Sequence, residues 1–132
     1  MDIKIFVATH KNYWMPEDDI YTPIHVGRKG KQDIGYIGDD TADNISDRND
    51  GYCELTGFYW IWKNVHTYKY VGTCHYRRYL LNEQEKIFTE AEYLELLKDY
   101  DLITTKRVVL NNSYHYGFAT HHNCLLYTSE LP

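Results

Sequence analysis

Short apolar runs alternate along the chain with segments of helical periodicity, and this alternation limits the fold more than any other feature of the sequence. Residues 3–10, 69–74 and 101–105 are short runs of the kind that form buried strands. Residues 50–64 and 88–100 have apolar positions at helical spacing. The order strand, helix, strand, helix, strand predicts one α/β domain, with a mostly parallel sheet and flanking helices.

The two predicted helices differ in how much of their surface is apolar. The first is apolar almost all round, which predicts burial on two sides, and Asn49 or Asp50 can cap its start. Its predicted apolar stripe consists of Tyr52, Leu55, Tyr59 and Trp62. The second helix has Thr89 and Glu92 at the spacing of a capping box, so its start is clear.

The longest stretch without a clean period runs from residue 11 to residue 50 and is rich in Gly, Asp, Asn and Pro. A polar stretch of this length in a compact domain is usually functional or disordered. Its scattered Ile, Tyr and Val residues predict an ordered loop that shapes a ligand site. Residues 39–49 are dense in Asp and Asn but lack the register of an EF-hand, so Asx turns that end in a helix cap are a better interpretation than calcium binding.

Charge and cysteine content argue against several classes of protein. With 14 Lys and Arg against 19 Asp and Glu, the net charge is −5, which argues against a nucleic-acid-binding protein. The basic residues occur in small clusters, which suits a small anionic ligand better than a polymer. The cysteines Cys53, Cys74 and Cys124 are odd in number and far apart in sequence, and neither a signal peptide nor a transmembrane run is recognisable, so we expect a cytoplasmic protein.

Two adjacent arginines follow the second predicted strand in the stretch "YVGTCHYRRYL". Ligands of an open parallel sheet bind beyond the carboxyl ends of its strands. Arginine presents a planar, permanently charged fork to anionic oxygens. If the strand continued, alternation would place His75 and Arg77 on one face, which predicts Arg77 as the anion ligand and Arg78 as the partner of a carboxylate. A structural salt bridge for both arginines is the alternative.

Polar residues also follow the other predicted strands. Thr9, His10 and Lys11 offer hydrogen-bonding groups at the end of the first strand, where an ordinary polar strand end is the alternative. Lys106 and Arg107 follow the third strand and either face a ligand or are solvated basic residues.

A zinc site is a weaker hypothesis, because zinc needs three or four converging ligands. His115 and His122 are seven residues apart and would share one helical face. This spacing, with His121 beside it, is not a standard zinc motif.

Three long blocks occur in order and at close spacing: "IKIFVATHKNYWMPEDDIYTPIHVG", "GYIGDDTADNISDRNDGYCELTGFYWIWKN" and "YVGTCHYRRYL". Together they resemble the bacterial domain of unknown function 4422, which occurs in capsular, exopolysaccharide and O-antigen biosynthesis proteins. That family is similar to nucleotide-sugar glycosyltransferases of the GT-A type. The resemblance covers residues 1–122 and implies that residues 1–123 form the N-terminal part of a GT-A-like, Rossmann-like domain.

The C-terminal residues 124–132 have a different character. The stretch "CLLYTS" matches the translation of a transposon end used in sequencing libraries, so we interpret these residues as a non-native tail. A genuine strand or helix start is the alternative.

The resemblance implies a glycosyltransferase that takes a sugar from a nucleotide-sugar donor, such as a UDP-hexose. The acceptor would be a glycan or lipid-linked glycan in surface polysaccharide assembly, at the cytoplasmic face of the membrane and with peripheral membrane association. A non-catalytic nucleotide-sugar or glycan-binding module and a metal-dependent hydrolase are the alternatives. The catalytic base is not assigned.

The resemblance also implies which residues bind the nucleotide sugar. GT-A enzymes usually carry Asp-x-Asp and a metal at the strand end where this chain has His75-Tyr76-Arg77-Arg78. Arginines could neutralise the leaving diphosphate there, which favours metal-independent transfer without a cofactor and leaves a divalent metal as the alternative. The candidates at the strand ends are Thr9, His10, Lys11, His75, Arg77 and Arg78, and those near the donor sugar are Asn44, Asp47 and Arg48.

Overall fold

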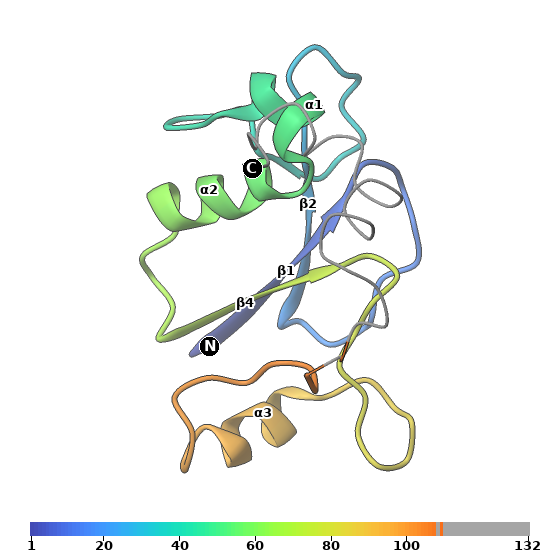
Figure 1. Ribbon diagram of the computed structural model, residues 1–132, viewed down its shortest axis with the longest axis vertical. Helices are drawn as coiled ribbons and strands as arrows, with labels where there is room; N and C mark the ends of the chain where they lie inside the picture. The colour runs from blue at the N-terminus through green and yellow to red at the C-terminus, as the bar shows by residue number, and fades with distance from the viewer. Residues whose placement is uncertain (108, 110–132) are drawn as a thin grey trace.

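The computed structural model describes residues 1–107 and residue 109. Four parallel strands form one sheet in the order β3-β2-β1-β4, and helices lie on either side of it (Figure 1). The strands are β1 (Ile3–Thr9), β2 (Tyr21–His25), β3 (Ile37–Gly38) and β4 (Tyr70–His75). The helices are η1 (Ser46–Arg48), α1 (Asn49–Tyr52), α2 (Leu55–Asn64) and α3 (Glu90–Leu96). The predicted α/β class with a parallel sheet and flanking helices is confirmed.

The central strand β1 pairs with β2 on one side and with β4 on the other, so that Val7 lies opposite both Pro23 and Cys74. Because all pairings are parallel, the carboxyl ends of the strands share one edge of the sheet. The chain first moves outward from β1 to β2 and β3, and then crosses to the other side of β1 to form β4. The strand order therefore reverses between β1 and β4, which is where open α/β sheets bind their ligands.

Each face of the sheet is covered by a different set of side chains. Ile5 and Val7 of β1 point to one face, where they pack with Tyr21 and with Tyr93 of α3. Phe6 points to the opposite face, where it packs with residues of β2 and α2, namely Ile24 and Ile61. Burial on both faces explains why β1 is a nearly continuous apolar run rather than an alternating one.

The predicted single helix over residues 50–64 is wrong, since the structure divides it into α1 and α2. Cys53 separates them with a φ of 52°, in the left-handed region that interrupts a helix. The predicted cap is also wrong: Asn49 lies within α1, and its Nδ2 donates to the carbonyl of Cys53 at the far end. The helix is not buried on two sides, because Trp62 is 66% exposed. The face through Gly57 and Ile61 meets the sheet instead.

Other differences concern the strands. The sequence did not predict β2 and β3, because they lie in the polar stretch and β3 has only two residues. The predicted strand over residues 101–105 is wrong, because these residues pair with no strand in the described part of the chain.

The predicted start of α3 is confirmed. Thr89 Oγ1 accepts from Glu92 N at 3.4 Å, and Glu92 Oε2 accepts from Thr89 N at 2.8 Å.

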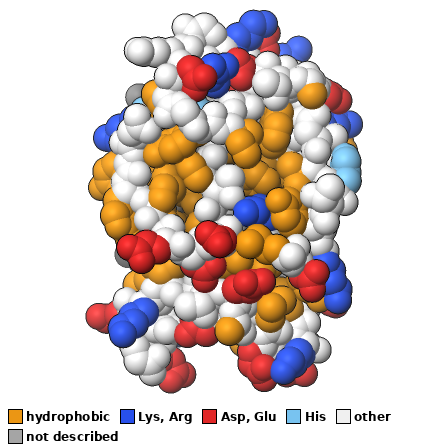
Figure 2. Space-filling model, turned by 180° about the vertical axis from the view of Figure 1, so that it is seen from behind, with side chains coloured by type: hydrophobic (Ala, Val, Ile, Leu, Met, Phe, Trp, Pro, Cys, Tyr) orange, Lys and Arg blue, Asp and Glu red, His pale blue; other side chains and the backbone are white. Residues whose placement is uncertain are grey.

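The surface mixes apolar and charged side chains. One face has hydrophobic side chains over its middle and charged side chains toward its two ends (Figure 2). No helix among residues 1–107 is long and apolar enough to cross a bilayer.

Candidate functional site

A small cavity of about 180 Å³ lies at the carboxyl edge of the sheet, where the strand order reverses. We call it the β1/β4 crevice, because residues at the ends of β1 and β4 line it together with the chain around α1. Its lining residues are Ala8, Thr9, His10, Val26, Asn49, Cys53, Glu54 and His75. The crevice thus combines the expected position in the fold with several polar side chains.

The loop after β1 supplies one wall of the crevice. Thr9 is almost fully buried, and its Oγ1 both donates to the carbonyl of Lys11 at 2.7 Å and accepts from Lys11 N at 3.3 Å. This tight turn exposes His10 and Lys11. Of the three predicted residues, Thr9 and His10 line the crevice, whereas Lys11 lies with its Nζ 5.7 Å from the ring of Tyr76.

The chain turns sharply at the end of β4. The strand ends at His75, and Arg78 N donates to the carbonyl of His75 at 2.8 Å, which closes a turn over residues 75–78. The alternation of side chains along a strand therefore ends at His75, and it does not distinguish Arg77 from Arg78 as the anion ligand. Both arginines are exposed at this edge, and Tyr76, which directly precedes them, is buried.

Neither arginine has a carboxylate partner among the described residues. The guanidinium carbon of Arg77 lies 5.2 Å from the centroid of the Tyr76 ring, a cation–π arrangement that fixes the side chain without neutralising it. Two unpaired guanidinium groups at the edge of an acidic protein can receive the oxygens of an anion.

His75 connects the arginines with the crevice. Burial lowers the pKa of His75 below its ordinary value, the carboxylate of Glu54 raises it, and the positive charges of Arg77 and Arg78 lower it further. At neutral pH the imidazole is therefore in its neutral form, which can accept a proton. Glu54 lines the same crevice and is exposed.

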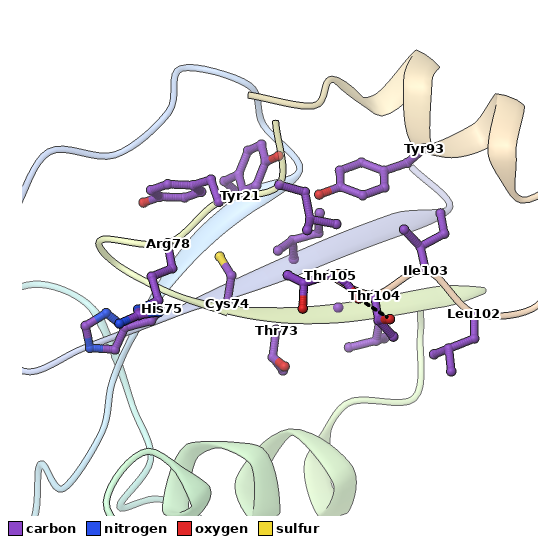
Figure 3. Close-up of a pocket in the computed structure, with 15 residues that line it drawn as sticks. Tyr21, Thr73, Cys74, His75, Arg78, Tyr93, Leu102, Ile103, Thr104 and Thr105 are labelled. Carbon is purple, nitrogen blue, oxygen red and sulfur yellow. Dashed lines mark hydrogen bonds between the residues drawn. The ribbon is translucent and has the colours of Figure 1, made fainter. Parts of the chain in front are cut away.

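A larger cavity of about 490 Å³ lies beside β4, and we call it the β4-edge cavity. His75 and Arg78 lie at one end of it, while Leu102, Ile103 and Tyr93 lie toward the other (Figure 3). Most of its lining is apolar: Ile5, Tyr21, Val71, Gly72, Thr73, Cys74, Tyr79 and Leu80 contribute from the sheet and the turn, and Leu102 to Thr105 from the segment after α3. Because His75 lines both cavities, it separates the crevice from this apolar space.

The β4-edge cavity has no reactive thiol. Burial raises the pKa of Cys74 to about 12, so the group is a neutral thiol at physiological pH. Burial also raises the pKa values of Tyr21 and Tyr93, which stay protonated. Among these groups of the β4-edge cavity, none is an ionised nucleophile at neutral pH.

The Asp-rich loop is organised around Asp39, which is fully buried. Its carboxylate accepts hydrogen bonds from the backbone N–H groups of Gly27 and Arg28, from Ser46 Oγ and from Thr56 Oγ1. These bonds join the ends of β2 and β3 to η1 and α2. The carboxylate thereby fixes the wall of the crevice, since Val26 and Asn49 flank the groups that it binds.

The three residues that the resemblance placed near the donor sugar do not line the crevice. Asn44 forms an Asx turn, in which its Oδ1 accepts from Ser46 N at 3.2 Å, so the predicted Asx turn is confirmed. Asp47 and Arg48 are exposed on η1. Asn49, directly after them, lines the crevice, as does Glu54. No pattern in the sequence singles out Glu54, because it lies between α1 and α2, a stretch whose periodicity predicts one continuous helix.

A metal site is not evident in the part of the chain that the structure describes, where no three His, Cys, Asp or Glu side chains converge. His115, His121 and His122 lie outside the described residues, as do residues 124–132. Lys106 and Arg107 are exposed.

The polar crevice and the two arginines thus lie at the reversal point of a parallel sheet, the position at which open α/β sheets bind ligands. The chain belongs to the family of domain of unknown function 4422, whose sequence model matches residues 4–131. It is also similar to the apo structure of the bifunctional glycosyltransferase WbbM, with 47% identity and a TM-score of 0.57 over 61% of this chain. No curated protein matches.

The similarity to WbbM makes the fold glycosyltransferase-like. The chain corresponds to only 14% of the length of that protein.

Proposed function

We propose that this chain is part of a glycosyltransferase that transfers a hexosyl group from a UDP-sugar to a glycan acceptor in surface polysaccharide assembly. The observation that carries the proposal is the pair of unpaired arginines beside a polar crevice at the reversal point of a parallel sheet. The 47% identity to part of a glycosyltransferase supports it. The GT-A type of fold and a place at the inner membrane surface belong to the same proposal.

In this proposal the diphosphate of the donor lies at the turn after β4. Arg77 and Arg78 would stabilise the negative charge that develops on the leaving diphosphate when the bond between its oxygen and the anomeric carbon breaks and the electron pair stays on that oxygen. The Arg77 guanidinium rests against the Tyr76 ring and Arg78 follows in the same turn, so in this proposal the two groups supply the positive charge and the step requires no metal ion. Thr9 and His10 at the end of β1 would contact the nucleotide from the other side of the crevice.

The acceptor hydroxyl must lose a proton as its oxygen bonds to the anomeric carbon. Glu54 and His75 line the crevice beside the turn after β4 and can accept this proton, since His75 is neutral at pH 7 and Glu54 is an exposed carboxylate; His10, across the crevice, is assigned to the nucleotide. One of them serves as the base if the reaction inverts the anomeric configuration.

Calorimetry with UDP tests the anion site directly on this chain. Arg77→Ala and Arg78→Ala should each weaken UDP binding on the order of tenfold, which is the usual loss when one charged hydrogen-bond donor is removed. Lys98→Ala is the matched control, because Lys98 is an exposed cation that pairs with Glu95 at the end of α3. Equal UDP affinity in all four proteins would refute the arginine site.

A non-catalytic module that binds nucleotide sugars is the second candidate, favoured by the small share of WbbM that this chain spans. Such a module would bind UDP through the same arginines without releasing it from a UDP-sugar. Incubation with radiolabelled UDP-galactose and separation of the products distinguishes the two, since only a transferase converts the donor.

A further inference from the structure

A row of aromatic rings leads away from the β1/β4 crevice. The ring of His75 lies 4.4 Å from that of Tyr76, and Tyr76 lies 4.9 Å from Tyr13. Trp14 follows Tyr13 in the chain and is 60% exposed. An exposed indole offers a flat apolar face with a polar N–H at its edge, which suits it to a ligand that is itself part apolar and part polar.

Trp14 is held in place although it is exposed. Its ring meets the ring of Tyr79 at an angle of 85° and a centroid distance of 6.1 Å, and Tyr79 meets Tyr21 at 81° and 5.7 Å. The hydroxyl of Tyr21 donates to the carbonyl of Phe88 at 2.6 Å. This series of contacts fixes the indole relative to the segment before α3.

A cavity of about 380 Å³ lies between Trp14 and that segment, and we call it the Trp14 cavity. Its lining residues are Trp14, Pro16, Glu17, Asp18, Tyr21, Lys86, Ile87, Phe88 and Thr89. The segment before β2 forms one wall and the segment before α3 forms the other. A hydrogen bond from Glu90 N to Asp18 Oδ2, at 3.2 Å, joins these two segments, in addition to the bond between Tyr21 and Phe88. The cavity is therefore preformed and does not depend on a ligand to assemble it.

The polar groups of the Trp14 cavity are free to bind a ligand. The carboxylate of Glu17 and the ammonium group of Lys86 are exposed, and neither forms a hydrogen bond or ion pair with another described residue. Together they offer an acceptor and a donor beside an aromatic surface. A sugar ring has the matching chemistry, with an apolar C–H face and hydroxyl groups around its edge.

Charge argues against the nucleotide as the occupant. Glu17 and Asp18 line the cavity and Glu90 adjoins it, against one cation, Lys86. A diphosphate would be repelled by these carboxylates, whereas a neutral hexopyranose would not. The volume of about 380 Å³ is in the range of small-molecule sites and accommodates a sugar ring.

We infer that the Trp14 cavity binds a neutral hexopyranose ring of the acceptor glycan, stacked on the indole of Trp14 and hydrogen-bonded by Glu17 and Lys86. That the sugar belongs to an acceptor rests on the proposed function, since Trp14 directly follows Tyr13, whose ring packs on Tyr76 next to His75 of the crevice. The glycan then passes the exposed ring of Tyr13, which packs on the buried Tyr76, with its growing end toward His75.

Nitrogen-15 NMR of the indole N–H groups tests this on the intact chain, with methyl β-D-galactopyranoside and UDP as separate probes. The galactoside should shift the Trp14 resonance saturably, in the millimolar range, and UDP should leave that resonance unmoved. Trp14→Ala should weaken galactoside binding on the order of tenfold and leave UDP affinity unchanged. Glu17→Gln should weaken galactoside binding too, and it removes no buried contact.

Trp62→Ala is the matched control, because Trp62 is an equally exposed indole on α2. Three outcomes overturn the inference: a Trp14 resonance that the galactoside does not move, a Trp14 resonance that UDP moves instead, or equal loss of galactoside binding in Trp62→Ala. Failure of UDP to bind at the arginines refutes the proposed function by a separate measurement. In that case galactoside binding at Trp14 still identifies a sugar site.

Discussion

The carboxylate of Asp39 accepts a hydrogen bond of 2.5 Å from Thr56 Oγ1, and this bond joins the end of β3 to the first turn of α2. Asp39 accepts three further hydrogen bonds in a fully buried position, two of them from the backbone after β2. A single side chain thus connects four segments behind the crevice. Its contribution depends on the tertiary structure, because the partners are up to 17 residues away.

Asp39→Ala should therefore destabilise the fold strongly. The substitution leaves four donors without their acceptor, and the expected loss is about 3–5 kcal/mol. Urea unfolding at pH 7 measures it. Asp43→Ala is the control in the same loop, since Asp43 is exposed and, among the described residues, its carboxylate accepts one hydrogen bond, from the hydroxyl of Tyr59. Equal stability of the two variants would contradict the role of Asp39.

Gly57→Ala should destabilise the protein although alanine favours helices. A Cβ at this position would lie 2.5 Å from Cγ1 of Val26, so α2 could not keep its distance from β2. The expected loss is about 1–3 kcal/mol in urea unfolding. The double variant Gly57→Ala/Val26→Ala removes the clash and should recover part of that stability. No recovery would show that the close approach at Gly57 is not the cause.

The pKa of His75 should respond in opposite directions to its neighbours. Glu54→Gln removes a charge that raises this pKa and should lower it further, whereas Arg77→Ala should raise it. NMR titration of the imidazole protons measures both. Because the folded pKa is below 6.5, the unfolded chain binds the proton more readily, so this group makes the fold less stable as the pH falls below 6.5. Shifts of the same sign in both variants would contradict the geometry.

Activity on a UDP-sugar should survive a strong chelator. In the proposed site the arginines neutralise the diphosphate, so removal of divalent metal does not reduce the stabilisation of the transition state. The rate of UDP release, measured with and without EDTA, should be the same. Loss of activity that magnesium or manganese restores would instead indicate a metal-assisted transferase or a metal-dependent hydrolase.

Local signals in the sequence predicted only some elements of the fold. β1 and β4 are apolar runs, and the capping box of Thr89 and Glu92 is visible as a spacing of three residues. The sequence did not predict β2 or β3, because each depends on a neighbouring strand: β2 pairs with β1, and β3 pairs with β2, in a polar stretch that has little strand signal of its own. Conversely, residues 101–105 have an apolar pattern but no strand beside them in the described chain.

The sequence by itself determined the α/β class, the position of His75 and the two arginines after a strand, and the start of α3. These features depend on residue types and on spacings of a few residues, and both can be read directly from the sequence. The tertiary structure decided that β4 crosses to the far side of β1, that the chain turns at His75, and that Glu54 meets His75 in the crevice. Such contacts join residues far apart in sequence, and packing selects them by burying the two faces of the sheet and satisfying groups such as Asp39.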